Sequence, residues 1–215
     1  NYRDQELLAA WKAKPTRTII GTEQRHDLET WLAARDHAQH AGQFLWSGID
    51  YLGESFGWPM IAAGFGLLDR TGAMKPMAYE RMAWWSPKPV VHVVRRTSPA
   101  KILPTDPGFA PILQQQTQYA DWTPADRNPH EETVEVYSNC EEVEVRLNGK
   151  SLGRKPRNAD DSPRVWKVQW NPGTLEATGR NNGKVVAKHA LHTAGKPAKI
   201  RLAIDKPRIT PDWDD

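Results

Sequence analysis

The sequence predicts an α/β region followed by an all-β sandwich. Up to residue 88, apolar residues recur with helical spacing or gather in short strand-like runs, in the order helix, strand, helix, strand. Beyond residue 89 the apolar period changes to two, and Asn-Gly turns separate the runs. The stiff junction Ser86-Pro87-Lys88-Pro89 divides the two patterns. We therefore expect domains at residues 1–88 and 89–204, with residues 205–215 beginning a further, truncated domain.

The composition excludes several classes of protein. The net charge is only +3, and 29 basic residues are interleaved with 26 acidic ones, so nothing indicates a nucleic-acid partner. No apolar run approaches the roughly 20 residues that cross a bilayer, and no membrane partner is expected. The single cysteine, Cys140, excludes an internal disulfide and a thiolate metal cluster. No dinucleotide fingerprint, phosphate loop or metal-spaced His pair appears, so we expect no cofactor and no metal.

Three helices and two strands are predicted in the α/β region. Helical spacing covers residues 6–14, 27–41 and 75–85, with Asp27 as an N-cap and Pro76 at a first helical position. The β-branched run at residues 18–20 does not alternate, which is typical of a strand covered on both faces. The second strand, at residues 43–46, follows a connection long enough for a helical crossover, so the two strands should be parallel neighbours.

The all-β region should hold about seven short antiparallel strands in an immunoglobulin-like sandwich. Its strongest signals are the two-residue turns Asn148-Gly149 and Asn182-Gly183 between alternating runs. The runs that we interpret as strands or parts of strands are 90–94, 133–137, 142–147, 151–153, 164–170, 175–178, 185–187 and 199–202.

Candidate site residues follow the two predicted parallel strands, whose carboxyl ends should meet at one edge. Glu23 could serve there as a nucleophile or general base, or be an ordinary glutamate favoured by a helix N-terminus. Trp46 ends the second strand, where a core role is the main alternative. Asp50 and Glu54 could bind sugar hydroxyls or cap local backbone. Tyr2 could donate its phenol to Glu23 or simply pack.

Two further patterns are weaker. Residues 53–57 fit the G-x-S-x-G elbow of serine esterases around Ser55, but that elbow requires a tight strand-to-helix turn, and Trp58-Pro59 continue a loop. Arg25 and His26 follow Glu23 closely, and a loop histidine is more often a surface residue than a ligand.

The ordered motifs of the chain resemble glycoside hydrolase family 2, the β-galactosidase and β-glucuronidase family, from the end of its catalytic barrel into an added immunoglobulin-like domain. Gly42-Gln43-Phe44-Leu45-Trp46-Ser47-Gly48-Ile49-Asp50-Tyr51-Leu52-Gly53-Glu54 is close to the family pattern G-x-F-x-W-x-G-x-D-Y-x-G-E. The other matching segments are residues 19–23, 66–69, 75–76, 136–140, 147–153 and 170–175.

The resemblance implies the C-terminal part of a (β/α)8 TIM barrel followed by the sandwich. It implies a retaining β-glycosidase that hydrolyses terminal β-glycosidic bonds through a glycosyl-enzyme intermediate, with Glu23 as the catalytic nucleophile and Tyr2 as its hydrogen-bonding neighbour. Trp46 would be the floor of the sugar subsite, with Asp50 and Glu54 near it. A β-galactoside or related carbohydrate would be the substrate. The family also favours a periplasmic or secreted location, although a cytoplasmic one stays open.

The sequence departs from the family at the acid/base glutamate. That residue belongs to an Asn-Glu pair on an earlier barrel strand, and no such pair precedes Glu23. We expect the chain alone to be inactive and to need the remainder of a parent enzyme. Its unpaired strand edges predict self-association into a homo-oligomer. The alternative from another class is a non-catalytic carbohydrate-binding or spacer module.

Overall fold

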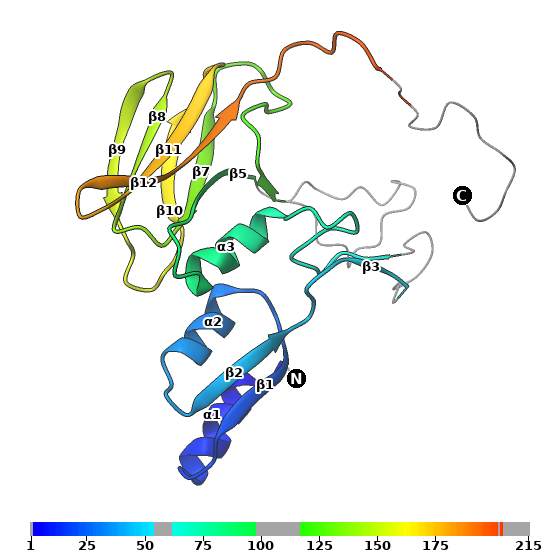
Figure 1. Ribbon diagram of the computed structural model, residues 1–215, viewed down its shortest axis with the longest axis vertical. Coiled ribbons are helices and arrows are strands. Elements are labelled where there is room, and N and C mark those ends of the chain that lie inside the picture. The colour runs from blue at the N-terminus through cyan, green and yellow to red at the C-terminus, as the bar shows by residue number, and fades with distance from the viewer. Residues whose placement is uncertain (1, 54–61, 98–116, 202, 204–215) are drawn as a thin grey trace, which may run out of the picture.

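The structure is a computed structural model that describes residues 2–53, 62–97, 117–201 and 203. Two regions are visible in Figure 1: a helix-and-strand region near the N-terminus and a β-sandwich, with helix α3 between them. Most of the described regular structure is β-strand.

The α/β region begins with a helix, strand, helix, strand unit. It consists of α1 (Asp4–Ala13), β1 (Ile19–Gln24), α2 (Leu28–Arg35) and β2 (His40–Leu45). The strands β1 and β2 pair in parallel, with Ile20 opposite Gly42, as the crossover predicts. Asp27 caps α2 by accepting a hydrogen bond from the Thr30 backbone N–H at 2.7 Å, which confirms the predicted N-cap.

Two expectations for this unit are wrong. β1 is not covered on both faces among the described residues: Ile19 is 5% exposed, but its neighbour Ile20 is 47% exposed. Within that part of the chain β1 and β2 form a two-stranded sheet, so the predicted barrel portion is not shown.

Helix α2 ends at Arg35 and not at residue 41. The His40 N–H donates to the His37 carbonyl and closes a turn there, so β2 starts earlier than predicted.

A short hairpin and a third helix complete the region. β3 (Tyr51–Leu52) and β4 (Ala62–Ala63) pair antiparallel, and α3 (Pro76–Trp85) follows. Pro76 stands at the start of α3, as predicted.

The sandwich consists of two four-stranded antiparallel sheets, with strand orders β10-β7-β5-β6 and β12-β11-β8-β9. Apart from the short β6, this separation of strands into two sheets follows the immunoglobulin-like pattern. The strands are β5 (Val91–Arg96), β6 (Gln118–Tyr119), β7 (Glu131–Ser138), β8 (Glu142–Leu147), β9 (Lys150–Pro156), β10 (Arg164–Gln169), β11 (Thr174–Asn181) and β12 (Lys184–His192).

The two Asn-Gly turns are confirmed as two-residue hairpin loops. Asn148 and Gly149 have φ of 51° and 81°, and Asn182 and Gly183 have φ of 50° and 75°, which suits the sequence because both turn positions require the left-handed region. The predicted strand at residues 199–202 is not found over 199–201, where Ile200 is 91% exposed and has no sheet to cover it.

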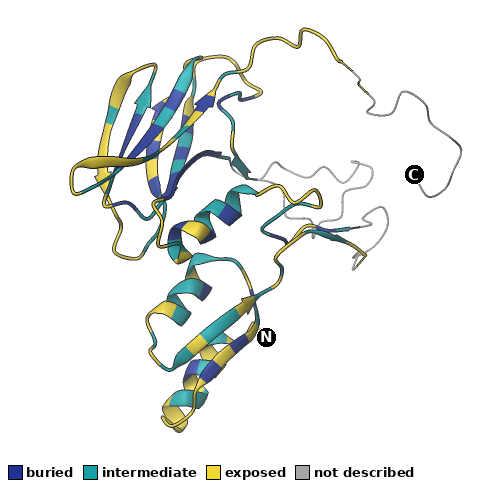
Figure 2. Ribbon diagram, in the orientation of Figure 1, coloured by how far each residue is buried: buried dark blue, intermediate teal, exposed yellow. Residues whose placement is uncertain are grey.

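The main core lies between the two sheets (Figure 2). Alternate residues of β5, β7, β8, β10 and β11 point inward, and Trp122 is fully buried among them. A second, smaller cluster packs one face of α3 on the sandwich and joins Tyr79 and Ala83 to Val90, Val94 and Tyr137. Helix α3 therefore covers part of the sandwich while also belonging to the α/β region.

Candidate active site

Glu23 lies at the carboxyl end of β1 and is held by Tyr2. The Tyr2 hydroxyl donates to Glu23 Oε1 at 2.7 Å, and the Tyr2 backbone N–H donates to the Glu23 carbonyl at 2.9 Å. Arg25 lies over the Tyr2 ring, with 5.4 Å between the guanidinium carbon and the ring centroid. The structure thus brings together the two residues that the sequence singles out as nucleophile and neighbour.

Trp46 follows β2 directly and lies beside the same strand end. Its backbone N–H donates to the carbonyl of Gln24 at 3.0 Å, one residue beyond Glu23. The Trp46 residue is 41% exposed, and its indole donates from Nε1 to the Tyr51 hydroxyl at 3.1 Å, with the two rings edge to face. Trp46 is therefore not a core tryptophan in this chain, because the residue is exposed.

Asp50 holds the returning loop against the strand end. Its Oδ1 accepts the Gly66 backbone N–H at 2.7 Å and the Lys75 ammonium at 2.7 Å. A side chain at Gly66 would meet the backbone of Ile49 and Asp50 at 2.2 Å, so only glycine allows this approach. Of the two roles considered for Asp50, the backbone contact is present. Glu54 and Ser55 lie outside the described residues.

A buried polar network lies behind the strand ends, and sequence reasoning missed it. Arg81 of α3 donates to His26 Nδ1 at 3.0 Å and to Gln43 Oε1 at 2.7 Å. Gln43 in turn donates to Gln24 Oε1 at 2.9 Å. Arg81 is 2% exposed, and this burial lowers the pKa of its guanidinium to about 10. The network fixes β1 and β2 to α3.

The expectation that His26 is a surface residue is wrong. Its side chain is 8% exposed, stacks on Trp84 at 5.2 Å, and lies 3.1 Å from a Glu80 oxygen. Since Arg81 can only donate to Nδ1, the His26 proton resides on Nε2 and points at Glu80. The burial of His26 follows from its contacts with Glu80 and Arg81 of α3. The sequence does not show that α3 lies beside His26, so it could not predict this burial.

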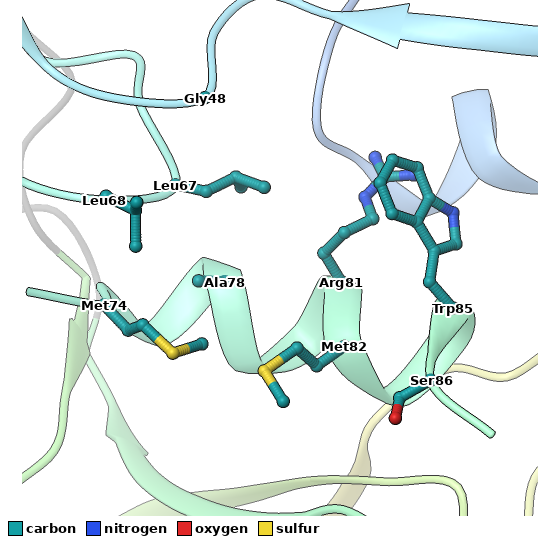
Figure 3. Close-up of a pocket in the computed structure, with 9 residues that line it drawn as sticks. All are labelled: Gly48, Leu67, Leu68, Met74, Ala78, Arg81, Met82, Trp85 and Ser86. Carbon is teal, nitrogen blue, oxygen red and sulfur yellow. The ribbon is translucent and has the colours of Figure 1, made fainter. Parts of the chain in front are cut away.

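An apolar pocket of about 370 Å³ opens on the face of α3 that carries Arg81, away from the sandwich (Figure 3). Leu67 and Leu68 line one wall, and Met74, Met82 and Trp85 project from the region of α3. Neither Glu23 nor Trp46 borders it, but Arg81 does, so this pocket adjoins the polar network and not the Glu23 carboxylate.

The described part of the chain lacks two further features, a metal-binding cluster and a membrane-spanning helix. No group of three His, Cys, Asp or Glu side chains there could hold a metal ion. None of the helices described above is long and apolar enough to cross a membrane.

Known proteins match the chain in both sequence and structure. A family model described as a domain of unknown function, DUF4982, matches residues 131–187 in the sandwich. A β-galactosidase of Bacteroides ovatus is 32% identical over 192 residues, covering 87% of this chain and 19% of that protein. A Formosa agariphila protein provisionally named a β-glucuronidase is 33% identical over 182 residues, covering 82% of this chain and 15% of that protein.

The solved structure of a glycosyl hydrolase family 2 member from Bacteroides cellulosilyticus superposes with a TM-score of 0.77 at 33% identity, covering 96% of this chain and 28% of that one. The fold and the relatives therefore define the class: the neighbours of this chain are glycoside hydrolases of family 2. More particularly, the chain is similar to one section of such proteins, since it spans less than a third of their length.

Proposed function

We propose that this chain supplies the nucleophile-bearing end of the catalytic barrel, and the sandwich after it, to a retaining β-glycosidase. The observation that carries the proposal is the hydrogen bond from Tyr2 to Glu23 at the carboxyl end of β1. The relatives named as glycosidases support the reaction class.

In this proposal Glu23 attacks the anomeric carbon of the sugar and forms an ester with it, while the bond from that carbon to the leaving oxygen breaks. Tyr2 orients the attacking carboxylate through its hydroxyl. The exposed ring of Trp46 forms the floor under the sugar. Asp50, through Gly66 and Lys75, shapes the wall beside it.

A second carboxylate must protonate the leaving oxygen and later activate water, about 5–5.5 Å from the nucleophile in retaining enzymes. The Asn-Glu pair that would supply it does not precede Glu23. We therefore propose that the chain is inactive alone and acts with the rest of a barrel. Ile20 and Phe44, which are 47% and 62% exposed at β1 and β2, support the need for such a cover.

The sandwich serves as a structural part in this proposal. Its outer face carries an ion-pair cluster in which Glu144 lies 3.0 Å from Arg146 and 3.2 Å from Arg180. Glu144 itself is 3% exposed, but its partners Arg146 and Arg154 are 42% and 51% exposed, and these solvated charges favour an ordinary surface over an aromatic platform for sugars.

The test is covalent trapping in the parent-length enzyme. A 2-fluoro-β-galactosyl inactivator should esterify Glu23, and peptide mapping by mass spectrometry should locate the label. Glu23→Gln should abolish labelling and lower kcat by roughly 10⁴-fold or more. Glu29→Gln, at the exposed first turn of α2, is the matched control and should label normally.

A label on another carboxylate would overturn the assignment of Glu23. An active parent that resists the galactosyl reagent but is labelled at Glu23 by its glucuronyl counterpart would keep the mechanism and change the sugar. Turnover by the purified chain alone would overturn the proposal that it needs a partner.

A further inference from the structure

The loop between β9 and β10 is built around Asp161. This residue has φ of 59°, in the left-handed region that aspartate tolerates better than most residues. Arg157 of the same loop lies 2.6 Å from Asp161 Oδ1. The carboxylate thus stabilises a backbone conformation that would otherwise be unfavourable.

Asp161 also contacts two helices outside the sandwich, α2 and α3. Arg35, the last residue of α2, donates to Asp161 Oδ2 at 2.7 Å, and the Trp84 indole of α3 donates to the Asp161 carbonyl at 3.1 Å. The Asp161 side chain is 10% exposed, so solvent screens these contacts only weakly. The carboxylates of Asp36 and Asp161 raise the pKa of Arg35.

Trp84 carries this contact to the strand that bears Glu23. Its indole stacks on His26 at 5.2 Å and on Trp31 of α2 at 5.8 Å, with the two indole planes nearly parallel. His26 is three residues beyond Glu23 and is clamped by Glu80 and Arg81. A continuous set of contacts therefore runs from the sandwich loop to the end of β1.

We propose that Asp161 is a positioning residue, through which the sandwich fixes the Glu23 strand by way of Trp84 and His26. Without the carboxylate, Arg35 and Arg157 lose their common partner and the loop is free to leave the left-handed conformation. The Asp161 carbonyl then turns away from Trp84, whose ring no longer holds the His26 imidazole in one plane. Only the consequence for catalysis rests on the proposed function.

The test compares Asp161→Asn with Asp160→Asn in the full chain. Asp160 lies in the same loop but bonds locally, to the Ser162 N–H at 3.0 Å, and is the matched control. Asp161→Asn should shift or broaden the nitrogen NMR signals of His26, which report the proton on Nε2. Amide hydrogen exchange over residues 19–26 should accelerate about tenfold, or about 1.4 kcal/mol, while exchange in β7 stays unchanged.

Arg35→Gln removes the same ion pair from the α2 side and decides the question should Asp161→Asn not fold. Unchanged His26 signals and unchanged exchange over residues 19–26 in the variants that fold would overturn the proposal. Changes confined to residues 157–163 would do the same, because they indicate a purely local role.

A kinetic measurement separates this proposal from the function of Glu23. In the parent enzyme Asp161→Asn should lower kcat about tenfold with KM unchanged, since the strand geometry matters most in the transition state. If Glu23 is not the nucleophile, the NMR and exchange changes persist and the loss of kcat is absent. If Asp161 does not act on the Glu23 strand through Trp84 and His26, the inactivator still labels Glu23, but the NMR and exchange changes are absent.

Discussion

The two regions of the molecule reach stability by different means. The sandwich closes an apolar core between its own sheets, with residues such as Val93, Val134 and Trp122 fully buried. The α/β region instead buries a polar network around Arg81 and Gln24 and leaves Phe44 of β2 62% exposed. The sandwich therefore closes most of its own apolar core, apart from the cluster that α3 covers, whereas the α/β region buries polar contacts and leaves apolar strand residues exposed.

The largest effect is expected in the sandwich core. Trp122→Ala removes a fully buried indole that also donates to the Asn171 carbonyl at 2.9 Å. The free energy of unfolding should fall by about 3–5 kcal/mol, measured by urea titration of the sandwich transition. Val185→Ala, at a position 50% exposed, should change it by less than about 0.5 kcal/mol. A loss below 1 kcal/mol for Trp122→Ala would contradict the apolar-core account.

A smaller effect is expected from the polar network. Arg81→Met keeps the unbranched apolar stem of the side chain but leaves His26 Nδ1 and Gln43 Oε1 without their donor. The α/β region should lose about 3 kcal/mol, because each buried acceptor without a partner costs about 1–3 kcal/mol. Thermal unfolding followed by tryptophan fluorescence measures this, with exposed Arg70→Met as the control. A stabilised Arg81→Met variant would show that burial of the cation outweighs its hydrogen bonds.

The smallest effect is a pH dependence where α3 meets the sandwich. His92 is 4% exposed and stacks between Tyr79, at 3.7 Å, and His189, at 4.2 Å, with Tyr137 at 6.5 Å. Burial, with the nearby His189 as a smaller cause, lowers the pKa of His92 to about 3. Burial also lowers the pKa of His189.

The unfolded chain therefore binds more protons than the folded one between about pH 3 and 6.5, so stability rises with pH in that window. From pH 6.5 to 5 His92 should cost about 2 kcal/mol, at about 1.4 kcal/mol per pH unit once the unfolded histidine is protonated. Urea unfolding at several pH values measures the slope, and His92→Phe should flatten it. An equal slope in His92→Phe would assign the dependence to other groups.

The sandwich was largely predictable because its signals are local. Alternation and the Asn-Gly turns at 148–149 and 182–183 each act within a few residues, and they fix which side chains face the core. The prediction of a strand at residues 199–202 is wrong over 199–201. An alternating run forms a strand only when a neighbouring strand pairs with it, and the local pattern does not show whether such a strand is present. The two-residue strand β6 was missed because nothing in its two residues distinguishes it from a loop.

The candidate site was predictable only in part. Glu23 could be placed from the end of an apolar run, whereas the position of Tyr2 left packing and a hydrogen bond to Glu23 both open, and the family resemblance implied the hydrogen bond. The contacts of His26 with Glu80 and Arg81 span more than fifty residues, so no local pattern reveals them. Asp161 is equally remote, since its partner Arg35 stands 126 positions earlier.

The placement of α3 has a consequence for anyone dividing this chain into expressible pieces. A cut at residue 88 follows the proline-rich junction, but it would strip Tyr79 and Ala83 from Val90, Val94 and Tyr137 and expose that cluster to water. A fragment that begins near Lys75 would retain α3, which covers this cluster. The proline-rich junction predicts a domain boundary at residue 88, but a fragment that keeps this cluster covered should begin before α3.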